Sequence, residues 1–152
     1  FGGTKGIGMV ISKTLRKRGD LVITASRSIS KKKLHLSIDL SSEKSKIKSS
    51  IQSYFKNKKL KIKNMVFCQR YRGKDPRIDF DVSLNSTSTI IDLLKNRMTK
   101  ESSIVMISSI AIKTVLEDRP LSYHLTRAGM DQMAKYYAVV LGNKGIRCNG
   151  RR

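Results

Sequence analysis

The chain of 152 residues has few cysteines, few acidic residues and no long apolar run. Its two cysteines, Cys68 and Cys148, are too few for a disulfide framework and suit a reducing compartment, so we expect a cytoplasmic protein. No apolar run approaches the roughly 18 residues of a membrane span, and no leader opens the chain, so we expect neither a membrane protein nor a secreted one. No group of histidine, cysteine and carboxylate side chains has the spacing of a metal site.

The scarcity of acidic residues gives the chain a formal net charge of +21, from 32 lysines and arginines against 11 aspartates and glutamates. The excess of positive charge is concentrated in residues 31–63, where Asp39 and Glu43 are the only acidic residues among the lysines. Such a segment can bind nucleic acid, but no aromatic residues interleave the lysines and no nucleic-acid motif is present. We therefore favour a solvated lysine-rich surface, keep nucleic-acid binding as the alternative, and expect the positive field to attract a polyanionic cofactor.

The residues that are present indicate one α/β domain. Apolar residues make up 39% of the chain, which is enough for a core, and the length accommodates one domain. Short apolar segments predict strands at 21–25, 34–40, 62–68, 104–107 and 146–149. Amphipathic segments between the strands predict four helices, namely from Gly8 to Gly19, from Ser42 onward, over 80–98 and over 122–141. The apolar positions of the first helix are Ile7, Val10, Ile11 and Leu15. Those of the second are Ile47, Ile51 and Phe55.

This alternation predicts a doubly wound parallel sheet with helices on both faces. Residues 1–152 would then form a single three-layer α/β/α domain of Rossmann-like architecture. The chain begins at Phe1 within a glycine run and ends at Arg152 directly after a predicted strand. We therefore expect an incomplete domain, truncated at both ends.

Gly2, Gly6 and Gly8 stand where a strand should pass into a helix. Residues without a Cβ let the backbone bend sharply there and approach a pyrophosphate, toward which the following helix points its free N–H groups and positive dipole end. The spacing is G-x-x-x-G-x-G rather than the G-x-G-x-x-G fingerprint. An ordinary glycine-rich loop therefore remains the alternative.

Two basic residues favour NADP over NAD as the ligand of this turn. Lys5 precedes Gly6, and Arg27 follows the next strand, where an acidic residue would bind the ribose 2′-hydroxyl of NAD. A cation at that place accommodates a 2′-phosphate instead. Asp39, at the end of the following strand, is a candidate acceptor for the adenine amino group, with a local capping role as the alternative.

The glycine motif and four further segments, in order along the chain, resemble the short-chain dehydrogenase/reductase family. The family's T-G-x-x-x-G-x-G opening matches from Phe1 onward, although Phe1 replaces the threonine. The other matches are its helical asparagine at Asn85, its I-S-S strand end at 107–109, its Y-x-x-x-K at Tyr123 to Arg127, and its G-I-R-V-N at 145–149. Together these matches cover the whole chain.

The resemblance implies an NADP(H)-dependent oxidoreductase that transfers a hydride between the nicotinamide and a small carbonyl or alcohol substrate. Tyr123 would be the general acid or base, Ser109 would hydrogen-bond the substrate carbonyl, and Asn85 would support the proton relay. Arg127, one helical turn after Tyr123, would supply the positive charge. The expected cofactor contacts are Gly2, Thr4, Lys5, Gly6, Ile7, Gly8, Ser26, Arg27, Asp39, Leu40, Tyr123 and Arg127.

Three features depart from the family pattern. Arginine replaces the motif lysine at 127, and it cannot release a proton to a relay, so we expect reduced activity. The N-N-A-G segment reads FCQR at 67–70, and the spacing from serine to tyrosine is one residue longer than usual. A relative that binds the nucleotide without turnover is therefore an alternative function.

Each candidate also has a local structural interpretation. A serine at a strand end is often a cap, and an asparagine in a helix often bonds locally. His124 lies about 100° around the helix from Tyr123, so we expect a packing or surface histidine rather than an acid or base. The cysteines are expected to be small buried hydrophobes. The family also implies a homo-oligomer, a dimer or a tetramer.

Overall fold

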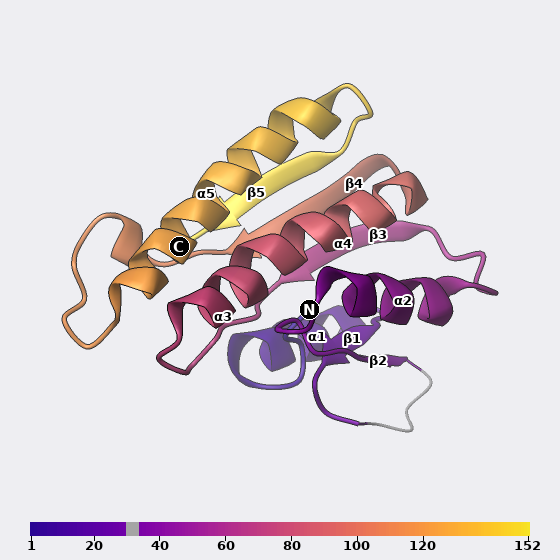
Figure 1. Cartoon of the computed structure of the whole chain (residues 1–152). Coiled ribbons are helices and arrows are strands. Elements are labelled where there is room, and N and C mark those ends of the chain that lie inside the picture. The colour runs from indigo at the N-terminus through magenta and orange to yellow at the C-terminus, as the bar shows by residue number, and fades with distance from the viewer. Residues whose placement is uncertain (30–33) are drawn as a thin grey trace.

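The computed structural model describes residues 1–29 and 34–152 (Figure 1). In chain order the elements are α1 (Gly6–Lys17), β1 (Thr24–Ser26), β2 (His35–Ser37), α2 (Lys44–Phe55), β3 (Ile62–Phe67), α3 (Pro76–Phe80), the π-helical turn η1 (Asp81–Asn85), α4 (Ser86–Leu94), the 3₁₀ turn η2 (Lys95–Arg97), β4 (Met98–Ile107), the 3₁₀ turn η3 (Ile110–Ile112), α5 (Leu121–Gly142) and β5 (Arg147–Arg151). The lysines at 31–33 of the basic segment lie outside the described residues.

All described strand pairs are parallel, and helices flank the strands, which confirms the predicted α/β class. One sheet has the order β1-β2, and the other has the order β3-β4-β5. In Figure 1, α2, α4 and α5 lie side by side in front of the strands. Among the residues that the structure describes, no helix combines the length and the apolar character needed to cross a lipid bilayer.

A groove of about 310 Å³ separates the two sheets. Residues 21–25 line one wall and residues 61–66 line the other. At the carboxyl end of the groove the backbone of Phe1 and Gly2 connects the sheets. The Phe1 carbonyl accepts a hydrogen bond from the Cys68 N–H at 3.0 Å, and the Gly2 N–H donates to the Ala25 carbonyl at 2.9 Å. The groove therefore lies between β1 and β3.

The strands are observed where a neighbouring strand supplies a ladder of hydrogen bonds. The strand predicted at 21–25 is reduced to β1, because residues 21–23 border the groove and have no paired strand among the described residues. Leu21 is accordingly 63% exposed. In contrast, β4 is longer than predicted, because it pairs with β3 on one side and β5 on the other.

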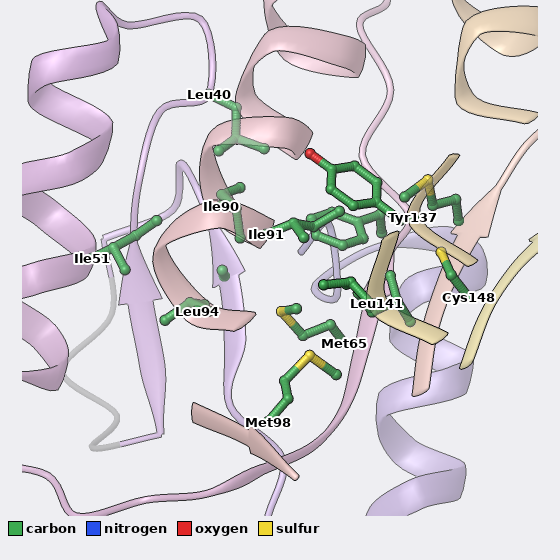
Figure 2. Close-up of a cluster of buried hydrophobic side chains, with 14 of the residues drawn as sticks. Leu40, Ile51, Met65, Ile90, Ile91, Leu94, Met98, Tyr137, Leu141 and Cys148 are labelled. Carbon is green, nitrogen blue, oxygen red and sulfur yellow. The ribbon is translucent and has the colours of Figure 1, made fainter. Parts of the chain in front are cut away.

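The core fills the space between the strands of both sheets and the helices α2, α4 and α5 (Figure 2). As predicted, Ile47, Ile51 and Phe55 form the buried stripe of α2. Figure 2 labels further members of the cluster, namely Leu40, Met65, Ile90, Ile91, Leu94, Met98, Tyr137, Leu141 and Cys148. Burial raises the pKa of the Cys148 thiol to about 11, so this cysteine is a buried hydrophobe, as expected.

Helix α1 buries small residues instead of the predicted apolar stripe. Ile7 and Val10 are 64% and 60% exposed, whereas Gly8 and Ser12 are buried. The prediction of the inward face was wrong for these two residues, because the helix approaches the glycine turn so closely that only small side chains fit between them. Ile11 and Leu15 are half-buried and line the groove. The Ser12 hydroxyl donates to the Gly8 carbonyl at 2.8 Å on this inner face.

Replacing Ile91 with alanine tests the core. Ile91 is 0% exposed, so the cavity left by Ile91→Ala should lower the free energy of unfolding by about 2–5 kcal/mol in urea denaturation. Val115 lies in the loop before α5 and is 78% exposed, so Val115→Ala is the control and should change the free energy by less than about 0.5 kcal/mol. Equal effects of the two substitutions would contradict the assignment of the core.

Candidate active site

The glycine turn before α1 depends on backbone contacts that leave no room for side chains. Gly2 has a φ of +69° and Gly6 a φ of +51°, a region that L-residues rarely adopt. A Cβ on Gly8 would lie 2.2 Å from the Gly2 carbonyl oxygen, and one on Gly2 would lie 2.7 Å from the Gln69 nitrogen. Helix α1 is therefore pressed onto the turn, and the turn is pressed onto the loop after β3.

The start of α1 can receive an anion. No side chain caps the helix at Lys5, and the first turn contains no acidic residue, so the N-terminal N–H groups are available to an anion. Lys5, Gly6 and Ile7 are exposed, and nothing lies within 4 Å of the place where a Gly6 Cβ would be. Thr4 is partly buried beside them.

The predicted adenosine-end residues Arg27 and Asp39 lie close together at the carboxyl ends of β1 and β2. Partial burial acts to raise the pKa of Asp39, but hydrogen bonds from Ser41 and the charge of Arg27 outweigh it and hold the pKa below its ordinary value. The Asp39 carboxylate accepts from the Ser41 N–H at 3.0 Å and the Ser41 hydroxyl at 2.7 Å, so it also has the local capping role.

Ser26 and Leu40 take different places at this edge of the sheet. The Ser26 hydroxyl accepts a hydrogen bond from the Ser28 N–H at 3.3 Å, next to Arg27. The side chain of Leu40 belongs to the core, so only its backbone is available to a ligand.

His35 supports the segment after β1, a role that the sequence did not indicate. The imidazole is 8% exposed and lies 2.8 Å from the Ser28 carbonyl through Nε2 and 2.9 Å from the Thr24 hydroxyl through Nδ1. A carbonyl only accepts, so Nε2 carries the proton, and in the neutral ring Nδ1 accepts from Thr24. His35 therefore holds the backbone directly after Arg27.

At the other end of the site, Tyr123 lies in the first turn of α5 among three arginines. The guanidinium carbon of Arg127 is 5.3 Å from the centre of the Tyr123 ring, which agrees with the expectation that both residues share a helix face. The guanidinium carbons of Arg70 and Arg119 are 5.7 Å and 6.0 Å from the same centre. The sequence did not indicate these two neighbours, because they come from separate loops.

Arg127 is directed into the protein. It is 2% exposed, and its guanidinium donates to the Ser83 hydroxyl at 2.6 Å and to the Ile107 carbonyl at 3.2 Å, while Nε has no partner among the described residues. Burial lowers the pKa of this guanidinium, and nearby Tyr123 and Asp79 oppose the shift. An arginine nevertheless keeps its charge in a protein, so Arg127 is a fixed cation below the phenol.

Asp79 is the buried counter-charge in this cluster, and the sequence analysis missed it. Its carboxylate is 3% exposed and accepts hydrogen bonds from three hydroxyls, those of Ser83, Ser122 and Thr126. Ser83 links Asp79 to Arg127. A buried carboxylate needs such donors, because its desolvation is otherwise costly.

Asn85 and Ser83 lie at different places on the π-helical turn η1. The amide of Asn85 is exposed and donates to the Asp81 carboxylate at 2.7 Å, whereas Ser83 contacts Arg127. Of these two residues, Ser83 is the one that contacts Arg127. The irregular turn places two successive polar positions on different sides of the helix, which sequence spacing alone cannot show.

The two serines after β4 are both buried and bonded locally. Ser109 accepts from the Ala111 N–H at 3.2 Å and so caps η3, which leaves its hydroxyl proton free to donate. Ser108 donates to the Arg127 carbonyl at 2.9 Å and ties the strand end to α5. His124 accepts from the Leu116 N–H at 2.9 Å and contacts the Pro120 carbonyl, so it packs the loop before α5 as expected.

The comparisons with known proteins agree with this arrangement. A family model described as enoyl-(acyl carrier protein) reductase matches residues 68–150, more than half of the chain. The chain therefore belongs to the short-chain dehydrogenase/reductase family of oxidoreductases. No curated protein matches the sequence at a significant level.

Solved structures share the fold over 98% of this chain. A short-chain dehydrogenase/reductase from Brucella ovis, in complex with a partially ordered NAD, has a TM-score of 0.86 and 22% identity, and 78% of its length is covered. A 4-hydroxyisoleucine dehydrogenase complexed with NADH and succinate has a TM-score of 0.84 and 19% identity, and 75% of its length is covered. The L-sorbose reductase from Gluconobacter frateurii, complexed with NADPH and L-sorbose, has a TM-score of 0.83 and 15% identity, and 65% of its length is covered. At these identities the likeness shows the fold.

Replacing Gly8 with alanine tests the glycine turn. The new methyl group would overlap the Gly2 carbonyl, so Gly8→Ala should lower the melting temperature in calorimetry, by about 2–4 °C for each kcal/mol of overpacking. Gly142 is helical and has nothing within 4 Å of its Cβ position, so Gly142→Ala should leave the melting temperature unchanged or raise it. A Gly8→Ala protein as stable as the parent would exclude the close contact.

Proposed function

We propose that the chain binds NADP(H) and carries out hydride transfer between the nicotinamide and a small carbonyl or alcohol substrate. The observation that supports this most strongly is the contact between the two halves of the site. Gly2 of the turn packs on Gln69, and the next residue, Arg70, reaches the ring of Tyr123. The turn, where an anion would bind, and Tyr123, which would donate the proton, thus lie at one edge of the sheet, as a dinucleotide site requires.

The glycine turn fits the diphosphate of such a cofactor. Positive φ angles at Gly2 and Gly6, the open space beside Gly6 and the uncapped N-terminus of α1 allow a close approach of phosphate oxygens. Lys5 lies at the same place and would add its charge. The residues that would hold the cofactor here are Gly2, Thr4, Lys5, Gly6, Ile7 and Gly8.

The preference for NADP rests on Arg27. It follows β1 directly, and its backbone neighbours are held by Ser26 and His35. A guanidinium at this place pairs with a 2′-phosphate, which NAD lacks. Asp39 would face the adenine, with Leu40 contributing its backbone. The similar solved structures include complexes with NAD, NADH and NADPH, so the preference is inferred from this chain's own residues.

The bound cofactor would supply or accept the hydride, and the protein would move the proton. In reduction, the Tyr123 hydroxyl would donate its proton to the carbonyl oxygen, and it would take the proton back in oxidation. Arg127 would stabilise the negative charge that forms on the phenol oxygen, from a position fixed by Ser83 and the Ile107 carbonyl.

Ser109 would orient the substrate, because its hydroxyl oxygen accepts from Ala111 while its proton remains available for a carbonyl oxygen. Asn85 would act at a distance from the phenol, through the turn η1, and Ser83 would take the position beside Arg127. The proton relay of the family would therefore be altered here at two places, the lysine and its neighbour.

Two further properties belong to this proposal. Exposed apolar residues on α5, namely Leu121, Leu125, Tyr136, Val139 and Val140, support pairing of two copies through this helix, and thus a homo-oligomer. The two free cysteines support a cytoplasmic location.

A second candidate function is nucleotide binding without turnover. The observation that favours it is the inward direction of Arg127, which is 2% exposed and donates to the Ser83 hydroxyl and the Ile107 carbonyl. A lysine at this position would have a shorter, more mobile ammonium group. The two functions differ in turnover and agree in nucleotide binding.

Cofactor preference is tested by fluorescence titration of the full chain with NADPH and NADH. We expect NADPH to bind at least about tenfold more tightly, and Arg27→Glu to remove this preference, because one charge-assisted phosphate contact is lost. Arg147 is exposed and begins β5 in the other sheet, so Arg147→Glu makes the same change in net charge and serves as the control. Equal loss of preference in both variants would assign the effect to the general field.

The role of Arg127 is tested by Arg127→Lys. This substitution should raise turnover with a panel of ketones and NADPH, because it restores the ammonium group of the family motif. Tyr123→Phe should abolish turnover, because the phenylalanine ring has no proton to donate. Unchanged or lower turnover of a folded Arg127→Lys protein would refute the proposed cause of low activity. Turnover that appears only in the lysine variant would favour the second candidate for the natural chain.

A further inference from the structure

We propose that Arg70 and Arg119 form a binding site for an anionic group of the substrate, so that the preferred substrate is a small carbonyl compound or alcohol bearing a carboxylate or phosphate. This inference rests on the proposed function, because it concerns the same site beside Tyr123. It adds a substrate class, which the family assignment leaves open.

The two arginines approach the phenol from separate loops. Arg70 lies in the loop after β3 and Arg119 in the loop between β4 and α5, and both are exposed. Their guanidinium carbons lie within 6.0 Å of the Tyr123 ring centre. A molecule whose reacting oxygen meets the phenol therefore passes close to both guanidinium groups.

These guanidinium groups have donors left for a ligand. Within residues 1–29 and 34–152, no carboxylate forms an ion pair with Arg70. Arg119 pairs with its neighbour Asp118 at 3.0 Å, but the Asp118 side chain is 70% exposed and that of Arg119 is 37% exposed, and such surface pairs contribute little. An arginine that stacks on an aromatic ring keeps its planar fork of N–H donors, which matches the two oxygens of a carboxylate or phosphate.

The third arginine does not compete for the same anion. Arg127 is buried, donates to Ser83 and lies in one cluster with the carboxylate of Asp79. Its charge is therefore compensated within the protein. The charge that faces solvent beside Tyr123 is that of Arg70 and Arg119, opposed only by Asp118 among the described residues that contact them.

Both loops are held in place at the residues that carry these side chains. The N–H of Arg119 donates to the Leu116 carbonyl at 2.9 Å, and the N–H of Leu116 donates to His124 on α5. On the other side, Gln69 is 7% exposed and donates to the Thr87 hydroxyl at 2.7 Å, directly before Arg70. An anion site needs this fixed backbone, because ordering two mobile loops would offset much of the binding free energy.

The test compares ligands that differ only in the anionic group. The full chain is saturated with NADP⁺, which cannot reduce a ketone, and titrated calorimetrically with 3-oxobutanoate and its methyl ester, and with dihydroxyacetone phosphate and dihydroxyacetone. At least one anion should bind about tenfold more tightly than its neutral partner, the effect expected of a charge-assisted pair. The two pairs distinguish a carboxylate ligand from a phosphate ligand.

Substitutions assign the preference to the two residues. Arg70→Gln and Arg119→Gln should each reduce the ratio of the two dissociation constants at least about threefold, and the double variant should bring it close to one. Arg72→Gln removes the same charge from an exposed arginine that has no contact with Tyr123, and it should leave the ratio unchanged. The dissociation constant of NADPH should be the same in all four variants.

Three results would overturn the anion site. The first is a ratio near one for both pairs in the natural chain. The second is an equal loss in Arg72→Gln. The third is a loss of NADPH affinity in Arg70→Gln with no change in the ligand ratio, which would assign Arg70 to the cofactor. If NADP⁺ does not bind at all, the proposed function fails, and titrating the same pairs into the cofactor-free chain and its variants still decides the anion site by the same criteria.

Discussion

The arrangement of this protein depends on the close packing of backbone at the glycine turn. The place of a Gly8 Cβ is already taken by the Gly2 carbonyl, and that of a Gly2 Cβ by the Gln69 backbone. This packing fixes the start of α1 against the end of β3 and leaves its N–H groups open to an anion. Arg70, which contacts the ring of Tyr123, directly follows Gln69 in the chain. The same packing therefore places the glycine turn next to the residues around Tyr123. The positions of the proposed phosphate site and of the candidate proton donor Tyr123 are thus set by one contact.

Around the phenol, charge is arranged in two layers. The inner layer consists of Arg127 and Asp79, which are buried and joined through the Ser83 hydroxyl. A buried carboxylate needs bonded donors, and the serine and threonine hydroxyls around Asp79 supply them, whereas Arg127 Nε has no partner among the described residues. The outer layer consists of Arg70 and Arg119, which face solvent. The inner layer would act on the phenol, and the outer layer is free to act on a ligand.

Much of this could be predicted from the sequence, because its local patterns and its motif order agree. Apolar spacing at Ile47, Ile51 and Phe55 gave the correct inner face of α2, and the Y-x-x-x-R spacing placed Arg127 beside Tyr123. The pattern was misleading at α1, where close backbone contact selects small residues and leaves Ile7 exposed. It also overestimated β1, since a strand needs a paired neighbour as well as apolar residues.

The rest of the site depends on contacts between distant segments, which a single sequence does not reveal. The hydrogen bonds between His35 and the Ser28 carbonyl, and those from Ser122 and Thr126 to Asp79, form only after folding. Asn85 matched the motif, but the π-helical turn directs it to Asp81 and places Ser83 beside Arg127. Spacing rules assume a regular helix, so where the turn is irregular they assign a side chain to the wrong side of the helix.

The central claim is that a nicotinamide dinucleotide binds along the edge formed by the glycine turn, Arg27 and Tyr123. Hydrogen exchange of the full chain, measured by mass spectrometry with and without NADPH at low ionic strength, tests it most directly. The account predicts slower exchange in residues 2–12, around Arg27 and in the first turn of α5, with little change in the lysine-rich surface of α2. Slower exchange confined to α2, or no change in residues 2–12, would contradict it.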